Sequence, residues 1–305
     1  MNTQAFGIDI GGSGIKGAPV DLDRGEFAED RLRIPTPQPS TPDAVADTVT
    51  QLLESFSVDH SVPVGVTFPA VIQHGVARTA ANVDKSWIGT DVDDLLTRRT
   101  GHDVFVVNDA DAAGIAEIEY GDKRARRGVV IVTTLGTGVG SALFHDGVLV
   151  PNSELGHVPL RGDSAEKYMA SSIREKEDLS WEAWAERLQE YYSLIEFLFS
   201  PDLFIVGGGV SKKHKHFLPL LDLKTPIVAG RLRNEAGIIG AAALAQQEAH
   251  ASSPREKGDA EHTKHKKHGE KHEKKHKKHG KKDKKKHDEK KHEKGTKDGS
   301  PHETE

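Results

Sequence analysis

The chain has 305 residues and no cysteine, and its composition changes sharply near residue 250. Residues 1–250 carry 23 Lys and Arg against 35 Asp and Glu, a charge of −12, whereas residues 251–305 carry 19 against 12, a charge of +7. The acidic larger part argues against specific nucleic-acid binding, and the lack of cysteine excludes disulfides, thiolate metal sites and a cysteine nucleophile. Because neither a signal peptide nor an apolar run of membrane-spanning length is visible, we expect a cytoplasmic protein without membrane contact.

Residues 251–305 are predicted to form a disordered Lys/His-rich tail. All 17 aromatic residues precede the tail, and its only apolar side chains are Ala251 and Ala260. Such a segment cannot bury enough apolar surface to offset the entropy lost on ordering. Three interpretations stay open: no dedicated ligand, attraction of a polyanion by the lysines, or capture of Zn²⁺, Ni²⁺ or Cu²⁺ by the histidines. The histidines recur at steps of three and four, at His262, His265, His268, His272, His276 and His279.

The first 120 residues alternate between short apolar strands and amphipathic helices. Glycine, proline and acidic turn residues separate these segments. Strands are expected at residues 5–10, 15–20, near 31–34, 64–68 and 104–107, and helices at about 43–56 and 110–120.

Beyond Gly121 the same order of elements begins again. A hairpin with a glycine turn opens this half as it opens the first, and Asp146-Gly147 is a second hairpin signal. Strands are expected at residues 129–134, 141–144 and 203–206, and helices at about 181–199 and 236–249. The repeated order predicts an α/β protein made of two similar halves with a cleft between them.

The first glycine turn is predicted to bind phosphate. Gly11-Gly12-Ser13-Gly14 links two strands, so its backbone N–H groups can face an anion, while Lys16 adds a positive charge. Asp9 is placed to hold a Mg²⁺-bound water beside that phosphate. A strand follows the turn, which excludes the Walker and Rossmann patterns, and an ordinary glycine hairpin is the alternative interpretation.

A second glycine turn, at residues 136–140, occupies the equivalent place in the second half. Its candidate phosphate-binding residues are Gly136, Thr137 and Gly138. Two such turns, one opening each half, can clamp a phosphate chain. The pairing resembles the ASKHA sugar kinases, which share the duplicated actin/hexokinase-like (ribonuclease H-like) fold, and in particular their ROK family. We therefore expect domains at residues 1–108, completed by helix 236–249, and at residues 109–235.

Asn108 and Asp109 stand where a buried strand meets a helix of small residues. A carboxylate at this point can face the cleft and take the proton of an attacking hydroxyl, so Asp109 is the candidate catalytic base and a sugar contact, with Asn108 as a sugar partner. Helix capping is the alternative role for Asp109, because Asn and Asp are preferred at that position. We expect Asp111 to provide the cap and Asp109 to be free.

Glu154-Leu155-Gly156-His157 matches the Glu-x-Gly-His signature of the ROK family. The resemblance implies that Glu154, His157 and the later Glu166 bind sugar hydroxyls. In many ROK proteins this histidine also binds zinc together with three cysteines, and this chain has none, so no zinc is expected. A buried histidine with a satisfied ring is the alternative interpretation of His157.

Within ROK the chain resembles the polyphosphate-using glucokinases over residues 5–245, and the tail departs from their pattern. The resemblance implies Mg²⁺, glucose, a polyphosphate donor and a homodimer. Gly207-Gly208-Gly209 stands where ROK kinases bind adenine nucleotides, so ATP stays open as a donor. Several basic residues are candidates to bind the donor phosphates, although each is equally explicable as a solvated surface charge. They are Lys16, Lys85, Arg161, Lys167, Lys212, Lys213, Lys215, Arg231 and Arg233.

The expected function is transfer of a phosphoryl group to the 6-hydroxyl of glucose. The alternatives are an ATP-dependent ROK glucokinase or glucomannokinase and, from another class, a sugar-sensing ROK protein without activity. Neither the preferred donor nor the choice between glucose and mannose follows from the residues.

Overall fold

The computed structural model describes residues 4–80 and 83–252, and the predictions made for the tail lie outside this part. Its first sheet has the strand order β3-β2-β1-β5-β8, with β4 also paired to β2. β1 and β2 form an antiparallel hairpin, and β1, β5 and β8 run parallel. The strands are β1 (Gln4–Gly11), β2 (Gly14–Asp21), β3 (Glu26–Phe27), β4 (Leu32–Ile34), β5 (Val64–Phe68) and β8 (Val104–Asn108).

The second sheet repeats this order as β11-β10-β9-β14-β15. β9 and β10 form the antiparallel hairpin, while β9, β14 and β15 run parallel, so each strand has a counterpart in the first sheet. The predicted duplication is confirmed at the level of topology. These strands are β9 (Val129–Leu135), β10 (Val139–His145), β11 (Val148–Val150), β14 (Leu203–Gly207) and β15 (Ile227–Ala229).

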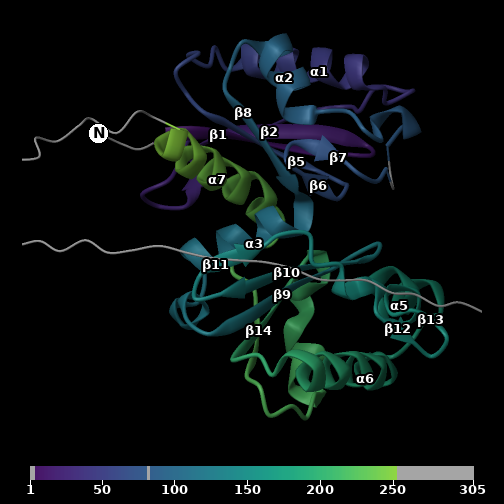
Figure 1. The fold of residues 1–305 in the computed structure, drawn as a ribbon. Coiled ribbons are helices and arrows are strands. Elements are labelled where there is room, and N and C mark those ends of the chain that lie inside the picture. The colour runs from purple at the N-terminus through teal and green to yellow at the C-terminus, as the bar shows by residue number, and fades with distance from the viewer. Residues whose placement is uncertain (1–3, 81–82, 253–305) are drawn as a thin grey trace, which may run out of the picture. The chain divides into compact units, whose positions relative to one another are not determined.

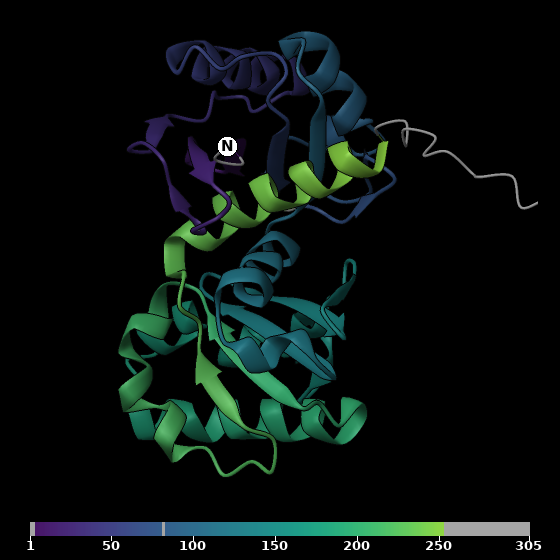
Figure 2. The ribbon, with the colours of Figure 1, turned by 90° about the vertical axis from the view of Figure 1, so that its left-hand side faces the viewer.

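Helices cover both faces of each sheet (Figures 1 and 2). α1 and α2 lie on one face of the first sheet and α7 lies on the other, against β1, β5 and β8. α3 packs on β9 and β10 of the second sheet, and α6 covers the opposite face. The helices are α1 (Pro42–Ser55), α2 (Val92–Thr100), α3 (Asp109–Tyr120), α4 (Glu166–Met169), α5 (Ser171–Lys176), α6 (Trp181–Phe199) and α7 (Ala236–Ser252).

α3 and α7 cross at very short range between the two sheets. A Cβ added at Gly240 of α7 would overlap the carbonyl oxygen of Ala112 in α3, and one at Gly65 of β5 would overlap that of Ala241. Only glycine leaves room for such approach. The crossing therefore fixes the position of α3, and with it the residues at the N-terminus of that helix.

All expected strands and helices are present, but several elements were not expected. α2 carries few apolar residues, and it is stabilised by the Asp91 side chain, which accepts from the Asp94 amide at its N-terminus. After the Glu154–His157 motif, a hairpin of β12 (Pro159–Leu160) and β13 (Asp163–Ser164) precedes α4 and α5. The unpredicted hairpin of β6 (Ile72–Gln73) and β7 (Val76–Ala77) follows β5.

Candidate active site

The N-terminus of α3 places Asp109 and shows that one prediction is wrong. The Oδ1 atom of Asn108 accepts hydrogen bonds from the amides of Ala110 (2.8 Å) and Asp111 (3.2 Å), so Asn108, not Asp111, caps the helix. Asn108 precedes the helix and has the extended ψ of a cap, whereas Asp111 already lies inside the first turn. The Asn108 Nδ2 atom donates to the carbonyl of Ala70 at 3.1 Å, which leaves one of its N–H groups for a ligand.

Asp109 opens onto a pocket of about 580 Å³ that we call the Asp109 pocket. The Asp109 side chain is exposed to this pocket. Desolvation by the surrounding protein raises the pKa of Asp109 to about 6, helped by the nearby charges of Asp9 and Glu154 and opposed by a hydrogen bond from the Ala110 amide. A carboxylate with such a pKa is a better proton acceptor than an ordinary aspartate. The pocket is lined by Asn108, Asp109, Glu154, His157 and Glu166, by residues 69–71 and Thr79, and by residues 134–140 with Gly208.

Glu154, His157 and Glu166 form a polar wall of this pocket. His157 lies between the two carboxylates, with Nε2 3.7 Å from Glu154 Oε2 and Nδ1 3.7 Å from Glu166 Oε1. Nδ1 also lies 3.1 Å from the Ser164 hydroxyl, and the ring is half exposed to the pocket. The interpretation of His157 as a buried core histidine is therefore wrong. All the residues predicted to bind sugar line a single cavity, and they offer both donors and acceptors to a polyhydroxyl ligand.

The first glycine turn lies outside the lining of the Asp109 pocket. Asp9 accepts from the Thr67 hydroxyl at 2.9 Å and pairs with Lys16 at 3.0 Å, so the charge of Lys16 is partly neutralised. Arg33, which the sequence did not single out, donates to the Ser13 carbonyl at 2.6 Å. Gly12 and Ser13 are exposed. The negative charge of Asp9 contributes to the raised pKa of Asp109.

The second glycine turn separates the Asp109 pocket from a neighbouring cavity of about 330 Å³, the Trp181 pocket. Gly136 and Thr137 line both cavities, and the Val139 amide donates to Glu166 at 3.3 Å. The segment Gly207-Gly208-Gly209 also contributes to both cavities. Gly207 ends β14, Gly208 lines the Asp109 pocket and Gly209 lines the Trp181 pocket.

The Trp181 pocket is rich in cations. The Arg174 guanidinium stacks on the Trp181 ring, with Cζ 3.6 Å from the ring centroid, and Lys213 Nζ lies 5.8 Å from that centroid. The buried Nε of Arg174 has no hydrogen-bond partner among the described residues. Lys212 and Lys213 both line this pocket, whereas Arg161 and Lys167 form ion pairs with Glu190 and Asp163. Arg174 and Trp181 were not predicted as site residues, since nothing local marks them.

Asn152 joins the two walls of the Asp109 pocket, and the sequence reasoning missed it. Its side chain accepts from the Ile72 amide at 2.9 Å and donates to the Ile72 carbonyl at 2.7 Å. Its own amide donates to the buried carboxyl of Asp111 at 2.8 Å. Val71, next to Ile72, and Glu154, two residues after Asn152, both line the pocket, so these bonds connect two of the segments that line it. The turn dipeptide Pro151-Asn152 was the only signal available.

Replacing Asn152 with glycine is expected to raise KM for glucose about tenfold, because two hydrogen bonds of about 1 kcal/mol each are lost. Glycine keeps the left-handed backbone, where φ is 59°. Steady-state kinetics should show the same rise with either phosphoryl donor and a smaller change in kcat. N152D should be at least as impaired, since it places a carboxylate oxygen against the Ile72 carbonyl. An unchanged KM in both variants would remove this positioning role.

The described helices include none that is long and apolar enough to span a membrane. The described residues also hold no group of three or more His, Cys, Asp or Glu side chains arranged to bind a metal ion.

The model of the ROK family matches residues 5–168, and the chain belongs to this family. It is 50% identical over 238 residues to polyphosphate glucokinase of Mycobacterium tuberculosis, which covers 78% of this chain and 89% of the relative. Polyphosphate glucokinase of Mycobacterium leprae is 48% identical over 240 residues, and the match covers 78% of this chain and 74% of that relative.

Solved structures agree with the family and the fold. The crystal structure of inorganic polyphosphate/ATP-glucomannokinase from Arthrobacter sp. strain KM is 54% identical with a TM-score of 0.76, and the match covers 81% of this chain and all of that one. A ROK glucokinase from Streptomyces griseus, solved with glucose and AMPPNP, has 23% identity and a TM-score of 0.66, which shows the shared fold. The predicted actin/hexokinase-like fold class is therefore confirmed.

Proposed function

We propose that the chain transfers a phosphoryl group from inorganic polyphosphate, and also from ATP, to the 6-hydroxyl of glucose, giving glucose 6-phosphate. The observation that carries the proposal is the Asp109 pocket, where a carboxylate of raised pKa faces a wall formed by Glu154, His157 and Glu166. The similarity to polyphosphate glucokinases over most of the chain supports the donor. The similarity to the Arthrobacter polyphosphate/ATP-glucomannokinase supports ATP as a second donor and mannose as a second acceptor.

In the proposed mechanism the sugar lies against Glu154, His157 and Glu166, with Asn108 offering its remaining N–H group. Asp109 accepts the proton of the 6-hydroxyl while that oxygen forms a bond to the terminal phosphorus of the donor. The bond from this phosphorus to its bridging oxygen breaks, and the shortened polyphosphate or ADP leaves with the electron pair. The rate gain comes mainly from alignment and from stabilising charge, as is general for phosphoryl transfer.

The donor is assigned to the two glycine turns and the Trp181 pocket. The shared wall of Gly136 and Thr137 would bring its terminal phosphate next to the sugar, with Gly138 beside Glu166. Arg174, Lys212 and Lys213 would neutralise the phosphates that follow. From the first sheet, Gly11, Gly12, Ser13 and Gly14 would approach the same phosphates, and Gly207, Gly208 and Gly209 would border a nucleotide.

Magnesium is the metal that suits this chemistry, and the residues fit it. Asp9 presents a partly exposed carboxylate, and Mg²⁺ is usually held by one or two carboxylates, waters and substrate phosphates rather than by a cage of protein ligands. Asp9 would hold the ion through water, and the ion would neutralise donor phosphate charge. Lys16, already paired with Asp9, would balance the charge on the protein side.

Initial rates with glucose and with mannose, each tried with polyphosphate and with ATP, test the proposed function. Transfer from polyphosphate to glucose is expected to be the fastest of the four. A chain active with ATP alone would be an ATP-dependent ROK kinase, and a chain that binds glucose without any transfer would be a sugar-sensing protein. The homodimer stays a prediction, which sedimentation equilibrium would check.

Metal removal should separate magnesium from zinc. We expect EDTA to stop turnover and added Mg²⁺ to restore it, because the donor phosphates need a counter-ion. A zinc-selective chelator should leave activity and the circular dichroism spectrum unchanged, since the three cysteine ligands of related zinc sites are missing. Loss of structure on zinc removal would show that His157 binds a metal after all.

A further inference from the structure

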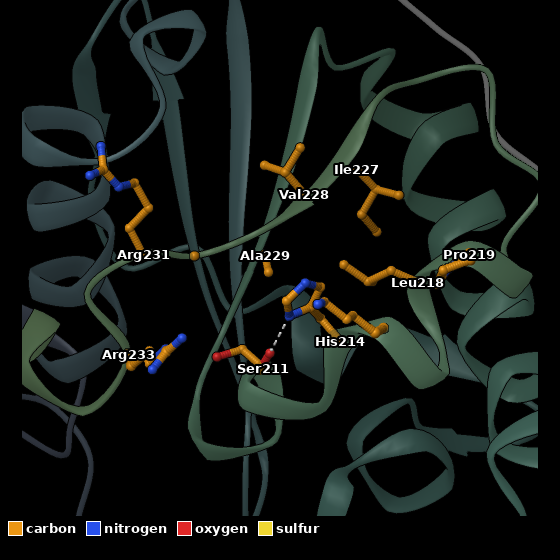
Figure 3. A pocket seen from close by; sticks show the side chains of 11 residues that line it. Ser211, His214, Leu218, Pro219, Ile227, Val228, Ala229, Arg231 and Arg233 are labelled. Carbon is orange, nitrogen blue, oxygen red and sulfur yellow. Dashed lines mark hydrogen bonds between the residues drawn. The ribbon is translucent and has the colours of Figure 1, made fainter.

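A third cavity, of about 780 Å³, lies beside the open edge of the second sheet and has no part in the mechanism above. We call it the Arg231 pocket. Figure 3 shows Arg231 and Arg233 at one end and Leu218 and Pro219 at the other, with His214 between them. Lys215 also lines it. The cavity thus combines a cationic end with an apolar end.

The cations of this pocket have no ion-pair partner in the part of the chain that the structure describes. Among the described residues no carboxylate forms an ion pair with Lys215, Arg231 or Arg233. Nearby acids are engaged elsewhere. Glu117 is buried and accepts from the backbone amides of Arg231 and Leu232, and Asp122 pairs with Arg124. Three positive charges around one cavity, none of them in a direct ion pair with a described residue, favour an anionic ligand.

The backbone adds further hydrogen-bond donors. β15 is the last strand of the second sheet, so one of its edges is unpaired. Phe204 donates to the Pro226 carbonyl and Gly230 donates to the Val206 carbonyl, which fixes the side of β15 that faces β14. Because backbone groups alternate along a strand, the amides of Ile227 and Ala229 face the open edge, and both residues line the pocket.

Only one short segment separates this pocket from the Trp181 pocket. Lys212 and Lys213 of the 3₁₀ segment η4 (Gly209–His216) line the Trp181 pocket, whereas Ser211, His214 and Lys215 of the same segment line the Arg231 pocket. His214 is held by its Nδ1 atom, 2.9 Å from the Ser211 carbonyl. Cations that line cavities therefore lie on both sides of η4.

We propose that the Arg231 pocket binds a distal stretch of the polyphosphate chain whose terminal phosphate lies at the Asp109 pocket. This inference rests on the proposed polyphosphate donor. A long polyanion binds more tightly with each further cation that it contacts, since counter-ions are released at every contact. ATP and short polyphosphates end before the Arg231 pocket and gain no affinity from it. The pocket thus makes the enzyme prefer long donors.

The test compares the full chain carrying K215Q, R231Q and R233Q with a control carrying R31Q, K123Q and R127Q. The control also loses three positive charges, but at exposed positions outside the three pockets. Both proteins keep the lysine-rich tail, so any contribution of the tail cancels. KM is measured for long-chain polyphosphate, tripolyphosphate and ATP at low and high salt, and direct binding of long-chain polyphosphate is measured by calorimetry.

In the pocket variant, KM and Kd for long polyphosphate are expected to rise about tenfold at low salt, and the slope of log Kd against log salt is expected to fall by about two. Values for tripolyphosphate and ATP should match those of the control. Equal Kd values for long polyphosphate in variant and control would overturn the site even if transfer from polyphosphate is robust. Weaker binding by the variant, in a wild type that transfers only from ATP, would support the site and refute the proposed donor.

Discussion

Asp109→Asn is expected to lower kcat about 10³-fold while the Kd for glucose changes little. Asparagine fills the same volume at the N-terminus of α3 and still offers an oxygen to the Ala110 amide, but it cannot take a proton from the sugar. General base catalysis contributes about 10² to 10⁴ in rate, so the loss should fall in that range. A coupled assay for glucose 6-phosphate and calorimetry with glucose measure the two quantities.

The pH profile gives an independent check on this base. Because the pKa of Asp109 is raised to about 6, the free carboxyl is protonated and inactive below that value, so kcat/KM should fall as the pH is lowered through about 6. Asp111→Asn, which changes a buried carboxyl two residues away, is the matched control and should keep most of its turnover. Activity of D109N within about tenfold of the wild type would refute the assignment of the base.

Gly240→Ala is expected to destabilise the protein by about 3 kcal/mol or to prevent folding. Its added methyl group would overlap the Ala112 carbonyl oxygen, so α7 must move away from α3 and lose packing on α3 and on the first sheet. Overpacking a tight contact costs about 1 to 3 kcal/mol, and here the obstacle is rigid backbone rather than a movable side chain. Urea unfolding followed by circular dichroism gives the change in free energy.

Gly237→Ala in the same helix is the matched control. A Cβ at this position has its nearest neighbour, Thr67 Cγ2, at 3.7 Å, an ordinary contact. Alanine is favoured over glycine in helices by up to about 1 kcal/mol, so this variant should be as stable as the wild type or more so. If both variants unfolded at the same urea concentration, the close approach of α3 and α7 would have no role in stability.

Features that depend on neighbouring residues were predictable from the sequence. The glycine hairpins, the strands of β-branched residues and the strand-to-helix junction at Asp109 each carry a local pattern. Glu154, His157 and Glu166 were predicted from the family resemblance, and they line one cavity with Asn108 and Asp109. The distribution of roles at the junction was not predictable. Asn108 and Asp111 are both suitable caps by residue type, and only backbone conformation selects Asn108.

Features that depend on distant residues were not predictable. Asn152 bonds to Ile72, eighty positions earlier in the chain, and neither residue belongs to a pattern that names the other. Arg174 and Trp181 read as ordinary helix residues until folding stacks them beside Gly136. The fold divides five of the candidate cations between two pockets on opposite sides of η4, a division that the sequence does not reveal. They are Lys212 and Lys213 in one pocket and Lys215, Arg231 and Arg233 in the other.

The position of α7 has a consequence for the way the protein is made. The first sheet is complete once residue 108 has been synthesised, yet the helix that covers one of its faces begins only at Ala236. While the ribosome adds the intervening residues, the apolar surfaces of β1 and β5 that await α7 stay open to water and to other chains. The strands of the second sheet and α6, all encoded between residues 129 and 229, can assemble in the meantime. Closure of the first sheet is therefore a late event in biogenesis, and it is the stage at which chaperones would be needed.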